Sequence, residues 1–265
     1  MRHYHGTPLG GTRDSVARFI ASGNRHFLVP FPRHEDMPIV SESSCGFCLD
    51  NGAFSAWKSG HPITDWSPYY EWCLKWSSNP RFDFAIIPDV VDGTEEENNK
   101  LFGEWFKRCR LVDNGKFGSG IGFVEGAPVW HMHESLDRLE YLMGHSRIVC
   151  IGSSGEWPNP GTTSWHKRME DAMRILCDDK GHPRIKFHGL RMLNPAIVEM
   201  YPFYSADSTN VAQNSQLIRR YGMYCPATVS QRREILASRI ESVRSPSAWL
   251  GCENDKQQTL TLCET

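Results

Sequence analysis

The sequence lacks an apolar run long enough to cross a membrane. None of its hydrophobic segments approaches the roughly 18 consecutive residues that a spanning helix needs. The first residues also lack the basic start and apolar stretch of a secretory signal. We therefore expect no membrane contact and a cytoplasmic location, which is the host cytoplasm if a phage encodes the chain.

An excess of positive charge is also missing. The 29 Lys and Arg residues face 31 Asp and Glu residues, and the formal net charge is −2. A strongly basic protein is excluded, so any contact with nucleic acid has to be local. The C-terminal quarter has a local basic excess, and the interspersed Glu234 and Glu241 make a solvated helix face an equal alternative. Our candidates for phosphate contacts there are Arg219, Arg220, Arg232 and Arg233.

The cysteines lack the dense, regular spacing of a secreted disulfide scaffold. Nine is an odd count, and scattered cysteines favour reduced thiols. Cys45 and Cys48 would point to opposite faces of a strand, which opposes joint metal binding. His131 and His133 would share one face, but no third ligand follows at a telling distance. We expect no metal and no cofactor, while both pairs leave the question of a metal open.

Internal repeats are absent, and what the sequence does contain is a regular alternation of short β-rich runs with longer helical patterns. This alternation is typical of βα units, and 265 residues suit a single barrel. Helices are expected after Ser67-Pro68, after Thr94 with Glu97 as a capping box, and after Thr163. The expected strands are 27–31, 45–49, 82–87, 120–124, 147–151, 184–188, 203–206 and, weakly, 222–225.

The predicted fold is therefore an α/β, irregular (β/α)8 TIM-type barrel. No clear helix is expected between the first two strands, and the poorly defined last strand makes the closure irregular. We expect a single barrel domain over residues 1–246 and a polar C-terminal tail over residues 247–265. The oligomeric state is left open.

Acidic residues follow several predicted strands at the point where each strand ends. Asp50, Asp89, Glu125 and Asp207 all have this position. The carboxyl ends of barrel strands meet at one face, so these side chains should converge. One such residue is usually a turn former or a helix cap, but several gathered carboxylates repel one another and point to function.

The segments around these residues resemble the motifs of the tRNA-guanine transglycosylase family, in the same order. Leu49-Asp50-Asn51-Gly52-Ala53-Phe54 is similar to its Asp-Ser-Gly-Gly-Phe motif, and Pro88-Asp89-Val90 stands where the family has a second active-site aspartate. Gly122-Phe123-Val124-Glu125-Gly126 resembles Val-Gln-Gly-Gly. Ile151-Gly152-Ser153-Ser154-Gly155-Glu156 resembles Ile-Gly-Gly-Leu with its trailing Gly-Glu, and Ser205-Ala206-Asp207-Ser208 stands where the nucleophilic aspartate lies.

The resemblance implies a retaining double displacement on a nucleic acid. Asp207 would attack C1′, guanine would leave, and a free 7-deazaguanine base would take its place, with Asp50 as the acid and base. The same resemblance places Asp89, Glu125, Gly152, Ser153 and Phe54 around the base. A guanine-type base needs acceptors for N1–H and the 2-amino group, which Asp89 would supply, and a donor for O6, which the Ser153 backbone would supply.

Departures from the family pattern change part of this expectation. Glu125 replaces a glutamine, and an ionised carboxylate cannot donate to O6. Cys225, Cys252 and Cys263 lack the spacing of the family's C-terminal zinc cluster, so we expect no zinc subdomain. In the family that subdomain helps hold tRNA, and a small member without it resembles the relatives in phages and mobile elements that insert 7-deazaguanines into DNA. The resemblance therefore implies DNA as the preferred polymer over tRNA. The alternatives are a tRNA enzyme, an O-glycoside hydrolase built on the same paired carboxylates, and a non-catalytic paralogue that only binds nucleic acid.

Overall fold

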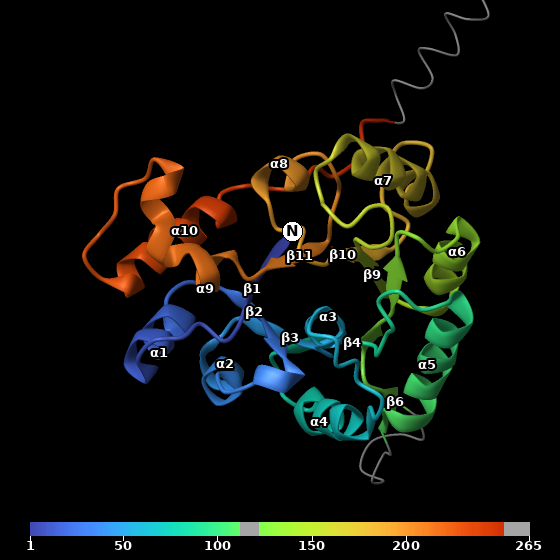
Figure 1. Ribbon diagram of the computed structural model, residues 1–265, viewed down its shortest axis with the longest axis horizontal. Helices are drawn as coiled ribbons and strands as arrows, with labels where there is room; N and C mark the ends of the chain where they lie inside the picture. The colour runs from blue at the N-terminus through green and yellow to red at the C-terminus, as the bar shows by residue number, and fades with distance from the viewer. Residues whose placement is uncertain (112–121, 252–265) are drawn as a thin grey trace, which may run out of the picture.

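A computed structural model describes residues 1–111 and 122–251 of the chain. Within this part, the fold is α/β, and the main sheet is a nearly closed barrel of nine parallel strands surrounded by helices, compatible with a TIM-type barrel (Figure 1). In chain order these strands are β1 (Arg2–Gly6), β2 (His26–Pro30), β3 (Gly46–Asp50), β4 (Phe82–Ile86), β7 (Gly126–Ala127), β8 (Val129–His131), β9 (Ile148–Gly152), β10 (Lys186–Gly189) and β11 (Ser205–Ser208).

The barrel is interrupted at Pro128. The order of strands around the sheet starts at β7, passes through β4, β3, β2, β1, β11, β10 and β9, and ends at β8. The two end strands are consecutive in the chain and separated only by Pro128. Proline has no N–H to donate to a ladder, so it divides what would otherwise be one strand.

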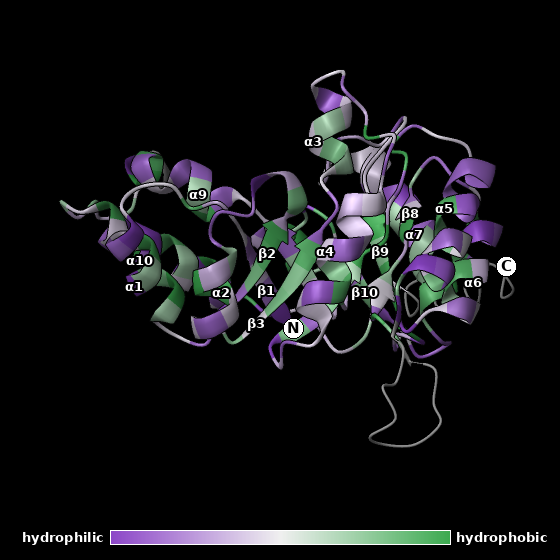
Figure 2. Ribbon diagram, turned by 90° about the horizontal axis from the view of Figure 1, so that it is seen from below, coloured by the Kyte–Doolittle hydropathy of each residue, from purple (hydrophilic) through white to green (hydrophobic). Residues whose placement is uncertain are grey.

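Helices follow the strands and cover the outside of the barrel. They are α1 (Arg13–Ala21), α2 (Met37–Ser43), α3 (Ala53–Lys58), α4 (Ser67–Ser77), α5 (Glu95–Arg108), α6 (Leu136–His145), α7 (Thr163–Leu176), α8 (Pro195–Val198), α9 (Asn210–Asn214) and α10 (Val229–Glu241), with 3-10 turns η1 (Phe31–Arg33) and η2 (Ser215–Tyr221). The short α3 departs from this arrangement, because it stands above the barrel beyond the end of β3 (Figure 2).

The three predicted helix starts are confirmed. Helix α4 begins at Ser67 with Pro68 in its first turn. The side chain of Thr94 accepts from the backbone N–H of Glu97, whose carboxylate accepts from the N–H of Thr94, so the capping box opens α5. Helix α7 begins at Thr163 and is capped by Thr162.

Two layers of apolar side chains form because neighbouring residues of a strand point to opposite sides. Inside the barrel lies a small cluster that includes Leu28, Cys48 and Phe84. The alternate residues Phe27, Val29, Phe47 and Leu49 belong to the larger cluster between strands and helices. Continuous apolar runs in the sequence therefore mark strands that are buried on both sides.

Three expectations about the elements were wrong. The strand weakly expected at 222–225 does not form. The barrel is completed by β1, which was not expected as a strand because its sequence is polar. Residues 122–123 pair antiparallel with Arg110–Leu111 outside the barrel, so the strand expected at 120–124 is displaced to β7 and β8. Helix α2 does lie between the first two expected strands.

The polypeptide remains packed past the predicted domain boundary at residue 246. Trp249 is buried, and its backbone N–H donates to the carbonyl oxygen of Gly181 over 2.8 Å. The expected loose tail from Ser247 therefore begins with residues that contact the barrel, while residues 252–265 lie outside the described part. Over the described ranges, no helix combines the length and apolarity that a membrane span requires.

Candidate active site

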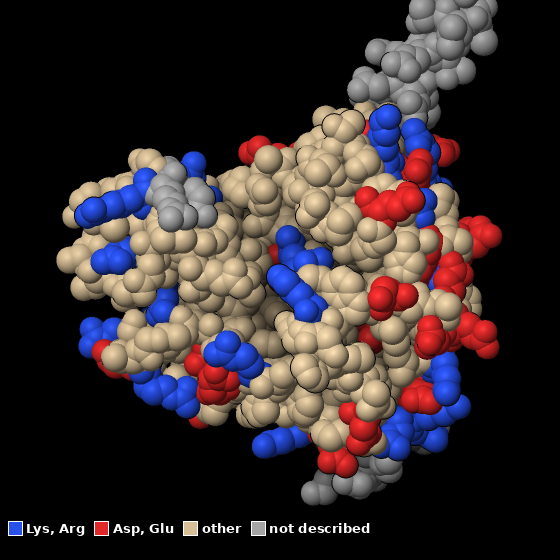
Figure 3. All heavy atoms as spheres, in the orientation of Figure 1, with Lys and Arg blue, Asp and Glu red and all other residues tan. Residues whose placement is uncertain are grey.

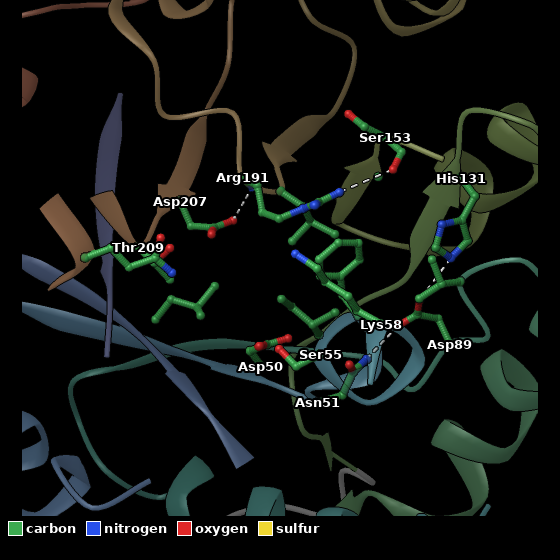
Figure 4. A pocket seen from close by; sticks show the side chains of 17 residues that line it. Asp50, Asn51, Ser55, Lys58, Asp89, His131, Ser153, Arg191, Asp207 and Thr209 are labelled. Atoms are coloured by element: carbon green, nitrogen blue, oxygen red, sulfur yellow. Dashed lines mark hydrogen bonds and ion pairs between the residues drawn. The ribbon is translucent and has the colours of Figure 1, made fainter. Parts of the chain in front are cut away.

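A cavity of about 390 Å³ opens at the carboxyl ends of the barrel strands. Six of the predicted site residues line it. Phe54 comes from helix α3, and the other five lie at or shortly after the ends of barrel strands: Asp50, Asp89, Gly152, Ser153 and Asp207. Figure 4 shows the three aspartates around one space, with Lys58 and Arg191 reaching across it. On the surface, this face is hollowed near its centre and has Lys and Arg atoms beside the hollow (Figure 3).

Asp207 is the last residue of β11 whose side chain points into the barrel, and it is buried. Its Oδ1 accepts hydrogen bonds from the backbone N–H of Arg191 at 2.9 Å and from Nε2 of His188 at 3.2 Å. Within the described ranges, no donor lies at Oδ2. The carboxylate is thus fixed through one oxygen, while the other is left for a ligand in the cavity.

Asp50 is the last residue of β3, and its environment disfavours the ionised form. Burial raises the pKa of its carboxyl group, the charges of Asp207 and Asp89 raise it further, and hydrogen bonding from the Gly52 backbone opposes them, which gives a pKa of about 7. The bond from Gly52 N–H to Oδ1 is 3.3 Å long. A carboxyl group that is half protonated near neutral pH is suited to proton transfer in both directions.

Asp89 is held from both sides. Its Oδ1 accepts from the side-chain amide of Asn51 at 2.8 Å, and its Oδ2 accepts from Nε2 of His131 at 2.9 Å. A carboxylate offers about four lone-pair positions, so two remain for a ligand. Asn51 also accepts from the N–H of Ala53 at 2.8 Å, which ties Asp89 to the start of α3.

His131 is a site residue whose role the sequence did not predict. It ends β8, lines the cavity and is buried. The buried carboxylate of Glu134 accepts from the backbone N–H of His131 at 2.8 Å and pairs with Arg138 at 2.5 Å. His133, which shares the His-x-His pattern with His131, contacts Ser154 Oγ at 2.9 Å and the Gly93 carbonyl oxygen at 3.1 Å.

Arg191 is the second residue that the sequence did not single out. Its φ of 59° lies in the left-handed region, which is unusual for a residue other than glycine. The guanidinium group lies 3.6 Å from the centre of the Phe54 ring and donates to the carbonyl oxygen of Ser153 over 3.3 Å. It therefore contacts two of the residues predicted to surround a base. Strained backbone of this kind is concentrated at functional sites.

Glu125 does not line the cavity, which corrects its predicted place beside the base. It comes immediately before β7, so it lies at the amino ends of the strands, opposite the cavity. There its carboxylate is 3.6 Å from Nη1 of Arg147, the residue before β9. The error follows from the displaced strand, because Glu125 precedes the true barrel strand instead of following it.

The four C-terminal arginines have different surroundings. Arg219 is exposed on η2, and the side chain of Arg220 lies outside the described part of the structure. Arg232 donates to the carbonyl oxygens of Pro226 and Ala227 at 2.8 and 2.7 Å. Arg233 is buried and donates to the carbonyl oxygens of Leu9 and Gly10, so a phosphate contact predicted for it is corrected to a structural role.

We expect Arg233→Ala to lower the free energy of unfolding by about 2–3 kcal/mol, because it removes the donor to the buried carbonyl oxygen of Leu9 and the packing of a buried side chain. Chemical denaturation of the purified variant measures this loss. Arg219→Ala is the matched control, since an exposed arginine should change the stability by less than about 0.5 kcal/mol. Equal stability of the two variants would contradict the structural role of Arg233.

The remaining candidates lie away from the cavity. Cys48 is buried inside the barrel, where burial raises the pKa of its thiol well above the usual value, and Cys45 is exposed immediately before β3. Within residues 1–111 and 122–251, no three His, Cys, Asp or Glu side chains are grouped as metal ligands.

Comparisons with protein-family models, with curated proteins and with solved structures found no match to this chain. The family resemblance therefore rests on the sequence motifs. What the fold and the cavity define is an α/β barrel with an acidic site at the carboxyl ends of its strands, the usual position of active sites in such barrels.

Proposed function

We propose that the protein is a transglycosylase that exchanges guanine in DNA for a 7-deazaguanine base through a covalent aspartyl intermediate. The observation that carries the proposal is the pairing of Asp207, fixed through one oxygen, with Asp50, whose pKa is about 7, in one cavity. One carboxylate suits a nucleophile, and the other suits a proton donor and acceptor.

The proposed reaction has two balanced steps. Asp207 forms a bond to C1′ while the bond from C1′ to N9 of guanine breaks, and Asp50 gives its proton to the departing base. Asp50 then takes a proton from N9 of the incoming 7-deazaguanine, whose nitrogen attacks C1′ and returns the electron pair to Asp207. The stereochemistry at C1′ is retained, because each step inverts it once.

The hydrogen-bond acceptors of Asp89 favour the binding of a guanine-type base over adenine. The free lone pairs of its carboxylate match the two donors at N1 and the 2-amino group, whereas N1 of adenine has no hydrogen to donate. Gly152 lines the same cavity, and a larger residue there would crowd His131, since its Cβ would lie 3.2 Å from Nδ1 of that residue. The Ser153 backbone is proposed as the donor to O6.

The choice of DNA as the polymer depends on the sequence. The cysteine spacing after residue 222 does not match the family's zinc cluster, and Cys252 and Cys263 lie outside the described residues. The cations beside the cavity, Lys58 and Arg191, suit a phosphate backbone of either polymer. The same proposal includes the fold: a barrel of the tRNA-guanine transglycosylase type that lacks the family's zinc subdomain.

An exchange assay tests the function. We expect the purified protein to release labelled guanine from DNA when a 7-deazaguanine base is supplied, with little release from tRNA. Release from tRNA alone would overturn the choice of polymer. Release from neither, with DNA binding retained, would favour the non-catalytic alternative.

A further inference from the structure

Asp207 is bound by the protein at only one of its two carboxylate oxygens. Both donors, the backbone N–H of Arg191 and Nε2 of His188, meet at Oδ1 at 2.9 and 3.2 Å. Hydrogen bonds draw negative charge to the oxygen that accepts them. The lone pairs of Oδ2 remain without a donor in the described part of the chain, so the two oxygens are not chemically equivalent.

The ring of His188 is held firmly in this position. Strands β10 and β11 pair in parallel with His188 opposite Ser205, and Ser205 shares the inner face of β11 with Asp207, two residues further on. Nδ1 of His188 is 2.8 Å from Ser205 Oγ, so both ring nitrogens have a partner. The ring is fully buried, with the edges of Tyr4 and Phe84 at centroid distances of 5.7 and 5.3 Å.

The second donor depends on a strained backbone. Arg191 has a φ of 59°, and its N–H points to Oδ1 of Asp207. A left-handed conformation is unfavourable for an ordinary L-residue. Such strain persists where the surrounding structure or the function fixes it. Two unrelated elements, a buried histidine and a strained turn, thus place a donor at the same oxygen.

We infer that Oδ2 of Asp207 is the oxygen that attacks C1′, and that His188 is a positioning residue that holds Oδ1 throughout the exchange. The inference rests on the proposed function. Attack by Oδ2 forms an ester in which Oδ1 is the carbonyl oxygen. When the second base attacks, the bond from C1′ to Oδ2 breaks and its electron pair returns to the carboxylate.

The two donors have opposite effects on the two steps. They withdraw charge from the free carboxylate, which makes it a slightly weaker nucleophile in the first step. They stabilise the charge that develops on Oδ1 as the ester breaks in the second step, as donors in an oxyanion hole do. Loss of the His188 donor should therefore slow the breakdown of the covalent adduct more than its formation, and the adduct should accumulate.

Two amide variants separate the two nitrogens of His188. In His188→Asn the amide nitrogen corresponds to Nδ1 and retains the contact with Ser205, while the donor to Asp207 is lost. In His188→Gln the amide nitrogen reaches the position of Nε2 and retains that donor. Single-turnover experiments on DNA measure adduct formation without a second base, and adduct breakdown after a 7-deazaguanine base is added.

We expect His188→Asn to slow adduct breakdown by about 10- to 100-fold while formation changes less than about 3-fold. The His188→Gln variant should stay within a few-fold of wild type in both steps. Equal slowing of both steps in His188→Asn, or no change in either, would overturn the inference. Formation of no adduct by the wild-type protein would overturn the proposed function, and the inference with it.

Ser205→Ala provides a second variant if His188→Asn does not fold, as judged from its thermal unfolding. It removes the hydroxyl at Nδ1 and leaves the imidazole in place but less firmly oriented. We expect the same preferential slowing of adduct breakdown, by about 3- to 10-fold, as the loss of one neutral hydrogen bond implies. If the ratio of the rates of adduct formation and adduct breakdown were the same in this variant as in wild type, the orientation of the ring would have no role.

Discussion

Replacing Asp207 by asparagine is expected to abolish base exchange, with a loss of at least about 10⁴-fold in the rate of adduct formation. The amide has nearly the same shape but neither the charge nor the nucleophilicity of a carboxylate. Rapid quenching of the reaction with labelled DNA measures the rate. The fold should persist, because removal of the charge relieves repulsion with Asp50, one of the causes that raise the pKa of that residue.

Asp83→Asn is the matched control for this experiment. Asp83 lies near the amino end of β4, where its carboxylate accepts from the hydroxyl group of Tyr4 at 2.8 Å and pairs with Arg2. The same chemical change there should leave the exchange rate within a few-fold of wild type, although some stability is lost. If Asp207→Asn retained exchange near the wild-type rate, Asp207 would not be the nucleophile.

Replacing Asp50 by asparagine is expected to slow exchange by about 10²- to 10⁴-fold, the usual contribution of a general acid or base. With a pKa of about 7, Asp50 loses its proton as the pH rises through neutrality. The wild-type rate of adduct formation should therefore fall above pH 7, and the residual rate of the variant should lack this dependence. A wild-type profile that is flat between about pH 6 and 8 would contradict the role of Asp50 as acid.

The same pKa gives an independent readout of stability. An aspartate ordinarily has a pKa of 3.8, whereas Asp50 in the folded protein has a pKa of about 7, so the folded state binds its proton more tightly. This contribution to stability is fully present below pH 3.8 and is lost as the pH rises through 7. The free energy of unfolding of Asp50→Asn should therefore exceed that of wild type by about 2 kcal/mol at about pH 8 and by little at about pH 4. The value at about pH 8 is set below what the full pKa shift would give, because solvent in the cavity screens the charge.

Strands buried on both sides could be predicted from the sequence, because both faces require apolar residues. The expectations at 82–87 and 147–151 match β4 and β9 to within a residue at each end. Strand β1 could not be predicted, since Arg-His-Tyr-His-Gly has no apolar run. Its polar side chains find partners far along the chain, as when Nε2 of His5 meets Glu241 on α10 at 2.8 Å.

Convergence of the three aspartates followed from one rule, that the carboxyl ends of parallel strands meet. The rule failed at Glu125 because Pro128 breaks the strand and hides where it runs. The same break concealed His131, whose place at the strand end would otherwise have been visible. Arg191 could not be found from the sequence, since no local pattern indicates that an arginine will adopt a φ of 59°.

The covalent intermediate is the central claim, and mass spectrometry of the trapped adduct tests it most directly. Wild-type protein is incubated with guanine-containing DNA without an incoming base, quenched, digested and mapped. We predict one adduct, in which the deoxyribose of an abasic site is attached to the peptide that carries Asp207. Attachment at Asp50 or another residue, or release of guanine without any adduct, would contradict the account.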